Sequence, residues 1–400
     1  MNRDAPIIAV LIAASDAEAT CFWYSRKMAD EKRAGIVLKL RNVASGRLEI
    51  NAGHVRRGIQ FLVNIGTPLV VGTLRGESQT ALAAVVVGMA FGFADSDGPL
   101  LSRLRILVLD AACIGVGAGL GLILRNNDAV LWPLFVAITF AVGVAPLTGR
   151  ALPLTGRHAA MAFTVGGAFP AAVGSVQIYY VLGVLLVAAV ARTVDYMIAG
   201  PLPRQPAAPL QLPSGRGGWL RYALAFAGAA TAALWIGQTL DPTHTIWVVA
   251  TTLVVMQADA RASYRRIVER IAGTFAGVFA AWLVVFAAPS VAFICAAILV
   301  VAPLIPHHLA NRYWLHTALI AVMILLAYYL AVRDTQGITQ LLSERVVDML
   351  LGCTLALVGT AAAFPHLAAA ELDSLVDEPS GSAVRPRRDG PASSHGEGSD

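Results

Sequence analysis

The stretch His244–Ala281 reads HTIWVVATTLVVMQADARASYRRIVERIAGTFAGVFAA and consists of two apolar segments joined by a charged turn. Arginines dominate the turn and the start of the second segment: Arg261, Arg265, Arg266 and Arg270. In a helix, Arg266, Arg270, Gly273 and Gly277 share one face, because their spacing follows the helical repeat. This face carries arginines at its start and glycines further along. Because glycine has no side chain, another helix can approach that part of the face closely. We therefore predict that Gly273 and Gly277 are packing positions.

These residues resemble the signature of the fusaric acid resistance (FUSC) or aromatic acid exporter family of membrane proteins. In that signature a helix with a His and a Trp near its start ends at Gln, and an Arg-rich turn and G-T-x-x-G follow. The matching positions here are His244, Trp247, Gln257, Arg265, Arg266, Arg270, Gly273, Thr274 and Gly277. The resemblance is close over 244–281 and looser over the remaining apolar segments. It implies export of small aromatic or other organic acids, driven by protons.

The composition is that of a polytopic membrane protein. Apolar residues make up 57% of the 400 residues, charged residues make up 14%, and the mean hydropathy is +0.66. The successive apolar runs suit helices that cross a hydrocarbon layer of about 30 Å. We predict an all-α membrane protein with about twelve transmembrane helices: 58–74, 79–94, 103–124, 129–146, 158–173, 176–199, 219–240, 244–258, 265–287, 290–306, 313–332 and 340–364.

The distribution of arginine predicts the orientation. With the N-terminus in the cytoplasm, the outer loops hold only Arg75, Arg125 and Arg333, and the other basic residues outside the spans are cytoplasmic. Cytoplasmic loops carry such an excess in membrane proteins. We expect a multi-pass protein of the cell inner (plasma) membrane with both termini in the cytoplasm. The net charge of +5 is explained by this asymmetry and needs no nucleic acid.

The second half of the chain repeats the first. A shift of 162 residues places Arg103 on Arg265 and Gly115 on Gly277, and a shift of 157 superposes the Ala-Pro-Leu triplets at 145–147 and 302–304. Six helices per repeat is an even number, so the two repeats run parallel. The pairs Arg192/Asp195 and Arg345/Asp348 look alike but need another shift, and we attribute that likeness to chance.

The predicted organisation has five parts. A cytoplasmic N-terminal segment (1–57) precedes the first six-helix repeat (58–200), a Pro-rich cytoplasmic linker (201–218), the second repeat (219–366) and a disordered cytoplasmic tail (367–400). Residues 1–40 are either a segment on the membrane surface or an extension from a mis-assigned start codon. The sequence leaves both open.

Ionisable residues inside or beside the spans are the candidate functional residues, because a charge within the bilayer costs about 3 kcal/mol or more. The substrate path is predicted from the arginines Arg265, Arg266, Arg270, Arg192 and Arg345. Proton coupling is predicted from the acids Asp110, Asp348 and Asp195. Helix packing is predicted at Gly273, Gly277, Gly115 and Gly119, with Gly117 and Gly121 as a second small stripe. The alternatives are that the Arg265–Arg270 cluster only anchors the topology, and that Arg192/Asp195 and Arg345/Asp348 are self-paired charges near helix ends.

Other functional classes have less support. There is no GxxxxGK[ST] motif, the four cysteines are scattered, and no Cys/His spacing indicates a metal or cofactor. We predict no enzyme, because no catalytic cluster is evident. A passive organic-anion channel stays open, since plant malate channels resemble the same family, and a membrane-embedded enzyme is the remaining alternative. The expected partners are small organic anions and the lipid bilayer. A homo-oligomer stays open, and the sequence offers no support for the periplasmic adaptor that some family members use.

Reporter fusions test the predicted topology. Fusions after Gly200 and after Glu371 should report a cytoplasmic location, and a fusion within 333–336 should report a periplasmic one. A periplasmic signal at Gly200 would contradict the arrangement of six helices before the linker and six after it.

Overall fold

The computed structural model describes residues 52–147, 151–169, 174–202, 215–240, 242–308, 312–332 and 337–365, which are helical and contain no β-strand apart from one isolated bridge between Gly98 and Leu202. The described residues from Gly53 onward form one compact unit. The predicted all-α class is confirmed. The predicted tail, most of the N-terminal segment and most of the linker lie outside the described residues.

The helices follow the apolar runs in chain order. They are α2 (Ala52–Leu74), α3 (Ser78–Phe93), α4 (Leu100–Leu124), α5 (Asp128–Val144), η1 (Ala145–Leu147), α6 (Ala151–Ala168), α7 (Ser175–Ala199), α8 (Gly215–Leu240), α9 (Pro242–Val255), α10 (Ala260–Ala287), α11 (Val291–Val301), η3 (Ala302–Leu304), α12 (Ile305–His308), α13 (Tyr313–Val332) and α14 (Ile338–Ala363). Each predicted span falls on a helix, and the tenth is shared by α11, η3 and α12. The helices α6 and α10 begin earlier than predicted, at Ala151 and Ala260.

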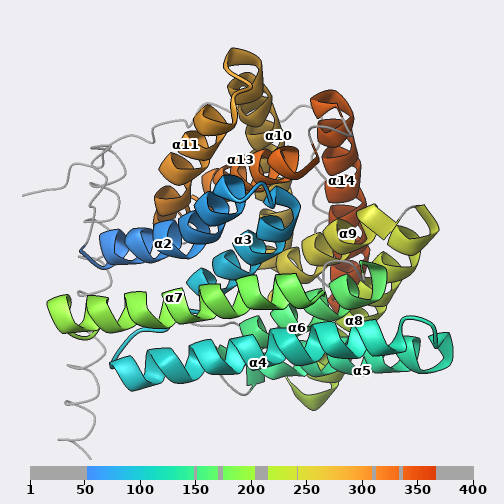
Figure 1. Cartoon of the computed structure of the whole chain (residues 1–400). Coiled ribbons are helices and arrows are strands. Elements are labelled where there is room, and N and C mark those ends of the chain that lie inside the picture. The colour runs from blue at the N-terminus through green and yellow to red at the C-terminus, as the bar shows by residue number, and fades with distance from the viewer. Residues whose placement is uncertain are drawn as a thin grey trace, which may run out of the picture. The chain divides into compact units, whose positions relative to one another are not determined.

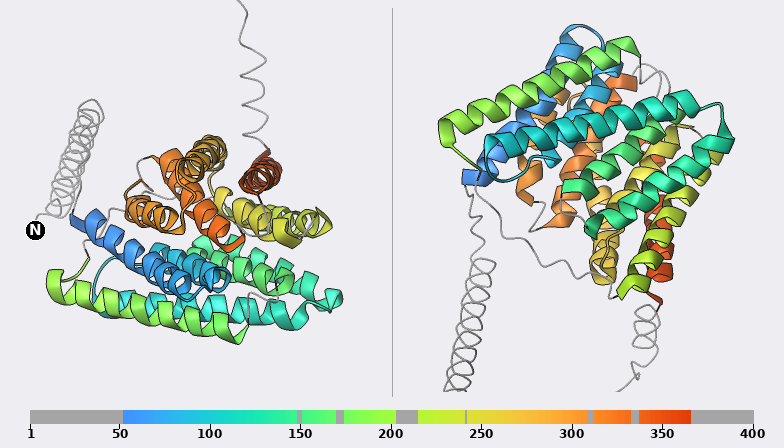
Figure 2. Two further views of the ribbon diagram at one scale, coloured as in Figure 1. Left: turned by 45° about the horizontal axis from the view of Figure 1, so that its top comes forward. Right: turned by 90° about the horizontal axis from the view of Figure 1, so that it is seen from below.

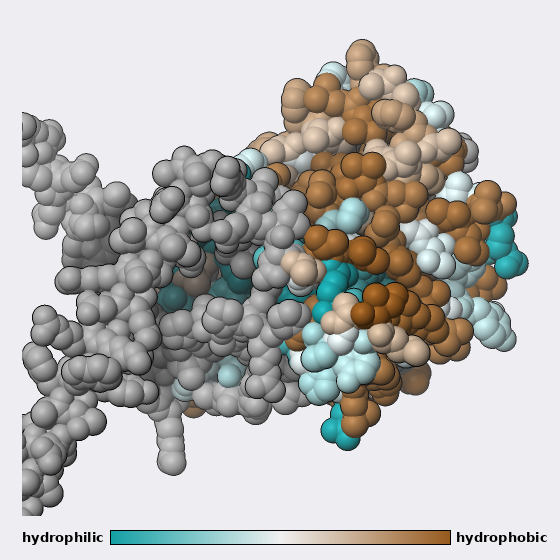
Figure 3. Space-filling view, turned by 90° about the vertical axis from the view of Figure 1, so that its left-hand side faces the viewer, coloured by the Kyte–Doolittle hydropathy of each residue, from teal (hydrophilic) through white to brown (hydrophobic). Residues whose placement is uncertain are grey.

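Six described helices are long and apolar enough to cross a membrane. They lie at Leu100–Leu124, Ser175–Ala199, Gly217–Leu240, Ala260–Ala287, Tyr313–Val332 and Thr339–Ala363. Large apolar side chains such as Leu182 and Leu186 on α7 and Phe279 and Phe286 on α10 are exposed. Hydrophobic residues also cover much of the coloured surface in Figure 3. Exposed apolar helix faces of this extent are typical of helices that contact lipid.

Contacts between side chains show that the helices alternate in direction. At one end, Arg56 near the start of α2 bonds to Asp195 near the end of α7, and Tyr222 near the start of α8 packs against Phe364 after α14. We call this the basic end. At the opposite end, Tyr180 near the start of α7 donates to Glu77 before α3. Every odd-numbered predicted span therefore runs away from the basic end, and every even-numbered one runs toward it.

Glycines set the closest helix contacts. A Cβ added at Gly117 or Gly121 of α4 would collide with the carbonyl oxygens of Ala159 or Phe163 of α6. The second half repeats this arrangement, because Gly273 and Gly277 of α10 lie against the backbone of α13 at Trp314 and Ala318. Without a Cβ the backbones come close enough for extensive van der Waals contact. The pairs α4–α6 and α10–α13 have the most extensive contacts of the helix pairs in the described chain.

The predicted packing role of Gly115 and Gly119 is wrong. No described atom lies within 4 Å of a Cβ built at either position. Two residues along a helix differ by about 200° in direction, so the stripe through Gly117 and the stripe through Gly115 point to nearly opposite sides. Only the first faces α6, and Gly115 is exposed.

Helices from the two halves of the chain also interlock. Helix α8 packs on α5, and α6 packs on α9. The corresponding contacts with the two halves exchanged are also present. Gly58 and Gly66 of α2 lie against Pro303 and Leu299, and α3 packs on α13. Figure 1 shows α3 between α7 and α13, and Figure 2 shows the helices of the first half as a layer beside those of the second.

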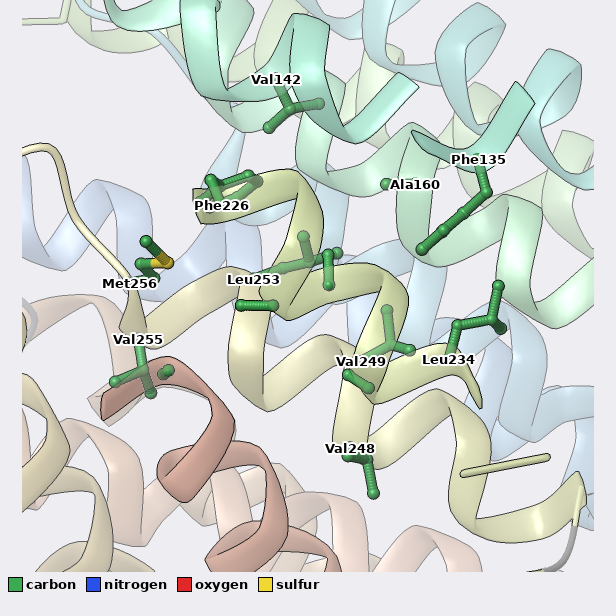
Figure 4. Close-up of a cluster of buried hydrophobic side chains, with 14 of the residues drawn as sticks. Phe135, Val142, Ala160, Phe226, Leu234, Val248, Val249, Leu253, Val255 and Met256 are labelled. Carbon is green, nitrogen blue, oxygen red and sulfur yellow. The ribbon is translucent and has the colours of Figure 1, made fainter. Parts of the chain in front are cut away.

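The largest hydrophobic core joins both halves. It surrounds α8 and α9, where Phe226, Leu253 and Met256 belong to the same cluster as Phe135 of α5 and Ala160 of α6 (Figure 4). Each of these side chains has at most a few per cent of its surface exposed. Between helices that contact lipid, such close packing stabilises the fold through van der Waals contacts, and it fixes α6 against α9.

Matched glycine substitutions on α4 test the packing assignment. We expect Gly117→Ala to lower the free energy of unfolding by about 1–3 kcal/mol, because the new methyl group overpacks the contact with α6. Gly115→Ala should be neutral or stabilise by up to about 1 kcal/mol through helix propensity. Thermal unfolding in detergent measures both. Equal effects of the two substitutions would contradict the assignment.

Candidate functional site

A network of buried charges joins four helices at the basic end. We call it the Arg103 network; its members are Arg56, Arg103, Arg192, Asp95 and Asp195. Arg103 is fully buried and donates to both oxygens of Asp95, at 2.9 and 2.7 Å, and to Asp195 at 2.6 Å. Arg56 donates to both oxygens of Asp195, at 2.7 and 2.9 Å. Bidentate pairs of this kind are the strong ion pairs in proteins.

The predicted self-pairing of Arg192 and Asp195 is wrong. Arg192 lies 3.1 Å from Asp95 and donates to the carbonyl oxygen of Phe91 at 2.5 Å, whereas Asp195 binds Arg56 and Arg103. Both side chains reach neighbouring helices, because α7 packs between them. Each of the three arginines forms an ion pair with at least one of the two aspartates, so the network fits a structural role that ties α2, α3, α4 and α7 together.

Asp110 has a partner from another helix. The side chain is fully buried on α4, and Nδ1 of His158 on α6 lies 2.9 and 3.1 Å from its two carboxylate oxygens. The imidazole of His158 is 10% exposed. Asp110 lies about 15 Å along α4 from Leu100, at 1.5 Å per residue. This His–Asp pair is the buried acid–base pair of the first half.

Two arginines and two tyrosines meet at the basic end between the two halves, and a third arginine lies one turn further along α10. We call this set the anion cluster: Arg157 of α6, Tyr222 of α8, Arg266 and Arg270 of α10, and Tyr313 of α13. Arg157 donates to the carbonyl oxygen of Met256 at 3.0 Å and hydrogen-bonds to Tyr222. The guanidinium of Arg266 stacks over the ring of Tyr313 at 5.1 Å. Arg157 and Arg266 are close enough to repel each other.

The anion cluster has donors that the described chain leaves unused. Nε of Arg157, Nε of Arg270 and the hydroxyl of Tyr313 are buried and have no hydrogen-bond partner among the described residues. No described carboxylate forms an ion pair with its three arginines, because Glu269 binds the exposed Arg265 at 2.7 Å instead. A buried donor without an acceptor costs about 1–3 kcal/mol. An anion that accepts these bonds would remove that cost.

A second arginine lies at the opposite end of the same helices. Arg345 of α14 is 6% exposed and sits over the rings of Trp247 at 4.4 Å and Tyr328 at 5.2 Å. Its Nη1 lies 3.1 Å from Asp348, so the predicted pairing of these two residues is found. None of its three nitrogens donates a hydrogen bond to a described residue. We call Arg345, Trp247, Tyr328 and Asp348 the aromatic arginine site.

The anion cluster and the aromatic arginine site are joined by α9, α10, α13 and α14. Tyr313 and Tyr328 lie about 22 Å apart along α13, and Thr317 between them has a buried hydroxyl without a partner in the described chain. The helices pack directly here, with Gly352 of α14 against Thr251 of α9. Two apolar surface grooves lie elsewhere, beside α8 at Leu224.

The structure separates the predicted arginines by environment. Arg266 and Arg270 join one cluster, Arg265 points to solvent with 72% of its side chain exposed, and Arg345 lies at the opposite end. Five important residues were not predicted: Arg103, Asp95, Arg56, Arg157 and His158. Arg157 was assigned to a loop and His158 to the first position of a span, because the predicted span began at 158, whereas α6 begins at Ala151. Asp95 and Arg56 lie outside the apolar runs, where a charge gives no signal of burial.

His307 also has a different environment from the one that the sequence favours, which is a solvated loop. It packs edge-on against the ring of His54 at 5.0 Å. Burial lowers the pKa of His54, and His307 and Arg57 lower it further. His54 is therefore neutral at neutral pH, and its ring packs against that of His307 between α2 and α12.

These features define an all-helical, multi-pass membrane protein with buried arginines at both ends of one helix group. Residues 230–359 match the family model described as fusaric acid resistance protein-like. The match confirms the resemblance of 244–281 and includes Arg266, Arg270, Tyr313 and Arg345, whereas Arg157, Asp110 and the Arg103 network lie outside it. No curated protein and no solved structure matches the chain.

The Arg103 network can be tested with two aspartates on the same loop. We expect Asp95→Asn to destabilise the protein by about 3–5 kcal/mol, because it leaves buried guanidinium charges uncompensated. Asp97, whose side chain is 25% exposed and contacts Arg57, should cost about 0–1 kcal/mol when changed to Asn. Thermal unfolding in detergent compares the two variants, and a silent Asp95→Asn would rule out the structural role.

Proposed function

We propose that this protein exports small organic anions, most of all aromatic carboxylic acids, from the cytoplasm across the inner membrane in exchange for protons. The observation that carries the proposal is the anion cluster, with three arginines, unused buried donors and no paired carboxylate in the described chain. Guanidinium groups bind carboxylates through paired hydrogen bonds. Both termini are cytoplasmic in this proposal, so the basic end faces the cytoplasm, as the distribution of arginine requires.

We further propose that the membrane region consists of twelve spans in two parallel six-helix repeats. The reciprocal contacts support this arrangement: α5–α8 corresponds to α11–α2, and α6–α9 corresponds to α13–α3. The two Ala-Pro-Leu triplets form the equivalent turns η1 and η3, which also fits a repeat. Shorter helices such as α3 and α9 cross the same thickness as their neighbours if the longer ones are tilted.

The aromatic arginine site gives the path a second binding position. An aromatic acid entering from the cytoplasm would bind its carboxylate at Arg266 and Arg270 and later meet Arg345 near the outer face. There, Trp247 and Tyr328 offer ring faces to an aromatic group. Because the helices between the two positions are packed together, an anion can pass only if they separate. This requirement fits a transporter that alternates between two states.

A passive organic-anion channel is the second candidate function. It is favoured by the same arginine-lined route, which a channel for anions also needs. The two candidates differ in their energy source. Flux that persists after the proton gradient has been collapsed supports the channel, and accumulation against a concentration gradient supports the exporter.

Everted membrane vesicles from cells that express the protein provide the test. A panel of labelled aromatic acids, starting with benzoate, is offered outside vesicles whose interior has been acidified. Uncatalysed weak acids leave an acidic compartment, so the proposed exchange must drive uptake in the opposite direction. Vesicles without the protein give the passive background. Absence of protein-dependent uptake or exchange for every acid of the panel would overturn the proposed transport.

Conservative substitutions separate substrate binding from topology anchoring. We expect Arg266→Lys and Arg270→Lys to weaken the affinity for the transported acid about 10- to 150-fold, which corresponds to about 1.5–3 kcal/mol. Lysine keeps the charge but loses the planar fork that binds a carboxylate. Arg265→Lys is the matched control and should change little, since Arg265 is exposed. The concentration dependence of vesicle uptake measures all three. Unchanged affinity in both Lys variants, at unchanged protein level, would leave these arginines as anchors only.

A further inference from the structure

The His158–Asp110 pair and the Arg266–Tyr313 pair occupy equivalent places in the two halves. Asp110 lies seven residues before Gly117, and Arg266 lies seven residues before Gly273. These glycines make the same contact, Gly117 with the carbonyl of Ala159 and Gly273 with the carbonyl of Trp314. The residue before Ala159 is His158, and the residue before Trp314 is Tyr313. The contacts that align the helices therefore align the two pairs as well.

The two pairs differ in the chemistry they can perform. The first half has a carboxylate bonded to an imidazole at 2.9 Å. The second half has a guanidinium over a phenol ring at 5.1 Å. Histidine is the side chain whose ordinary pKa lies in the physiological range, whereas arginine stays protonated. One half can therefore change its charge by taking up a proton, and the other holds a permanent positive charge.

Helix α6 connects the first pair to the anion cluster. His158 and Arg157 are consecutive, so their side chains leave the helix about 100° apart. His158 points to Asp110 on α4, and Arg157 bonds to the carbonyl of Met256 and to Tyr222. Any shift of α6 that follows a change at His158 also moves Arg157. Because His158 and Arg157 are adjacent on one helix, a movement that begins at the titratable group reaches the anion-binding group directly.

We infer that His158 and Asp110 form the proton site of the exporter, and that α6 transmits their protonation state to the anion cluster. This inference rests on the proposed function. With Asp110 ionised, Nδ1 of His158 donates to the carboxylate, so Nε2 is the atom that gains the transported proton. The pair then changes from one net negative charge to neutral. Release of the same proton from Nε2 restores the first state, and no other reactant is needed.

The surroundings of the pair favour a reversible charge change. From α7, Arg192 attracts Asp110, and from α4, Cys113 interacts with it. From α6, Thr155 hydrogen-bonds to Cys113 and Arg157 is adjacent to His158. Helix α5 has Asp128 only at its far end, and Thr245–Val255 of α9 contains no titratable side chain. Arg192 therefore stabilises the state in which Asp110 is ionised and His158 is neutral. In the other state, the protonated imidazole of His158 balances the charge of Asp110.

Two assays on the full-length protein in everted vesicles test the inference, with benzoate as the probe. Exchange of labelled for unlabelled benzoate requires no net proton movement, whereas accumulation into an acidified interior does. We expect His158→Gln and Asp110→Asn to keep exchange and to lose accumulation down to the level of vesicles without a gradient. The Gln side chain can still hydrogen-bond to Asp110, which separates loss of the proton from loss of folding. His307→Gln is the matched control and should accumulate benzoate as the wild type does.

The results that would overturn the inference are distinct. Wild-type accumulation in both His158→Gln and Asp110→Asn would show that the proton binds elsewhere. Loss of exchange together with accumulation, in variants that elute as folded protein from a sizing column, would place the pair in the anion path. Arg266→Lys should give the converse pattern, a weaker affinity with accumulation still dependent on the gradient. If the wild type neither exchanges nor accumulates any acid of the panel, the proposed function fails and the inference fails with it.

Discussion

A guanidinium buried among apolar helices must be compensated, because the transfer of a bare charge out of water is far more costly than any single contact can offset. The protein meets this constraint in two ways. At Arg103 and Arg192 the charges are compensated by Asp95 and Asp195, so that four helix ends are held by internal ion pairs. At Arg157, Arg266 and Arg270 no described carboxylate forms an ion pair. Arg157 donates to a backbone carbonyl oxygen, and Arg266 stacks over a tyrosine ring. The proposed function follows from this contrast.

The membrane-spanning helices were predictable because hydropathy acts over long segments. Each of the twelve apolar runs falls on a helix, and the errors lie at helix starts, as at Ala151 and Ala260, and at helix ends, as at Ala168 and Val255. The errors at helix starts have a common cause: the first turns of a membrane helix are often polar, and hydropathy places them in the loop. Arg157 was thereby placed in a loop, whereas it lies in the second turn of α6.

The register of the helix contacts and the partners of the charged side chains were less predictable, since both depend on which face of a helix meets its neighbour. Helix α4 carries two stripes of small residues, and the sequence alone gives no reason to prefer Gly117 over Gly115. The choice of Gly115 also fixed the shift of 162 residues between the halves, which placed Arg103 on Arg265. Likewise, the spacing of Arg192 and Asp195 allowed a pair within α7, but their partners come from helices far away in the sequence. By contrast, Arg345 and Asp348 are neighbours on one helix, and their local pairing was found.

The corrected register changes the interpretation of the proposed repeat. With Gly117 aligned on Gly273, the acid of the first half falls on an arginine of the second, and a histidine falls on a tyrosine. A duplicated helix pair with identical chemistry in both copies would offer two like charges across a shared core, which repel each other in a medium of low dielectric constant. Here the copies differ in sign and in their capacity to titrate, while the glycine contacts that hold them are the same. In the proposed repeat, the glycine contacts form a common frame on which the charged positions differ. In the proposed exporter, one copy would exchange the proton and the other would hold the anion.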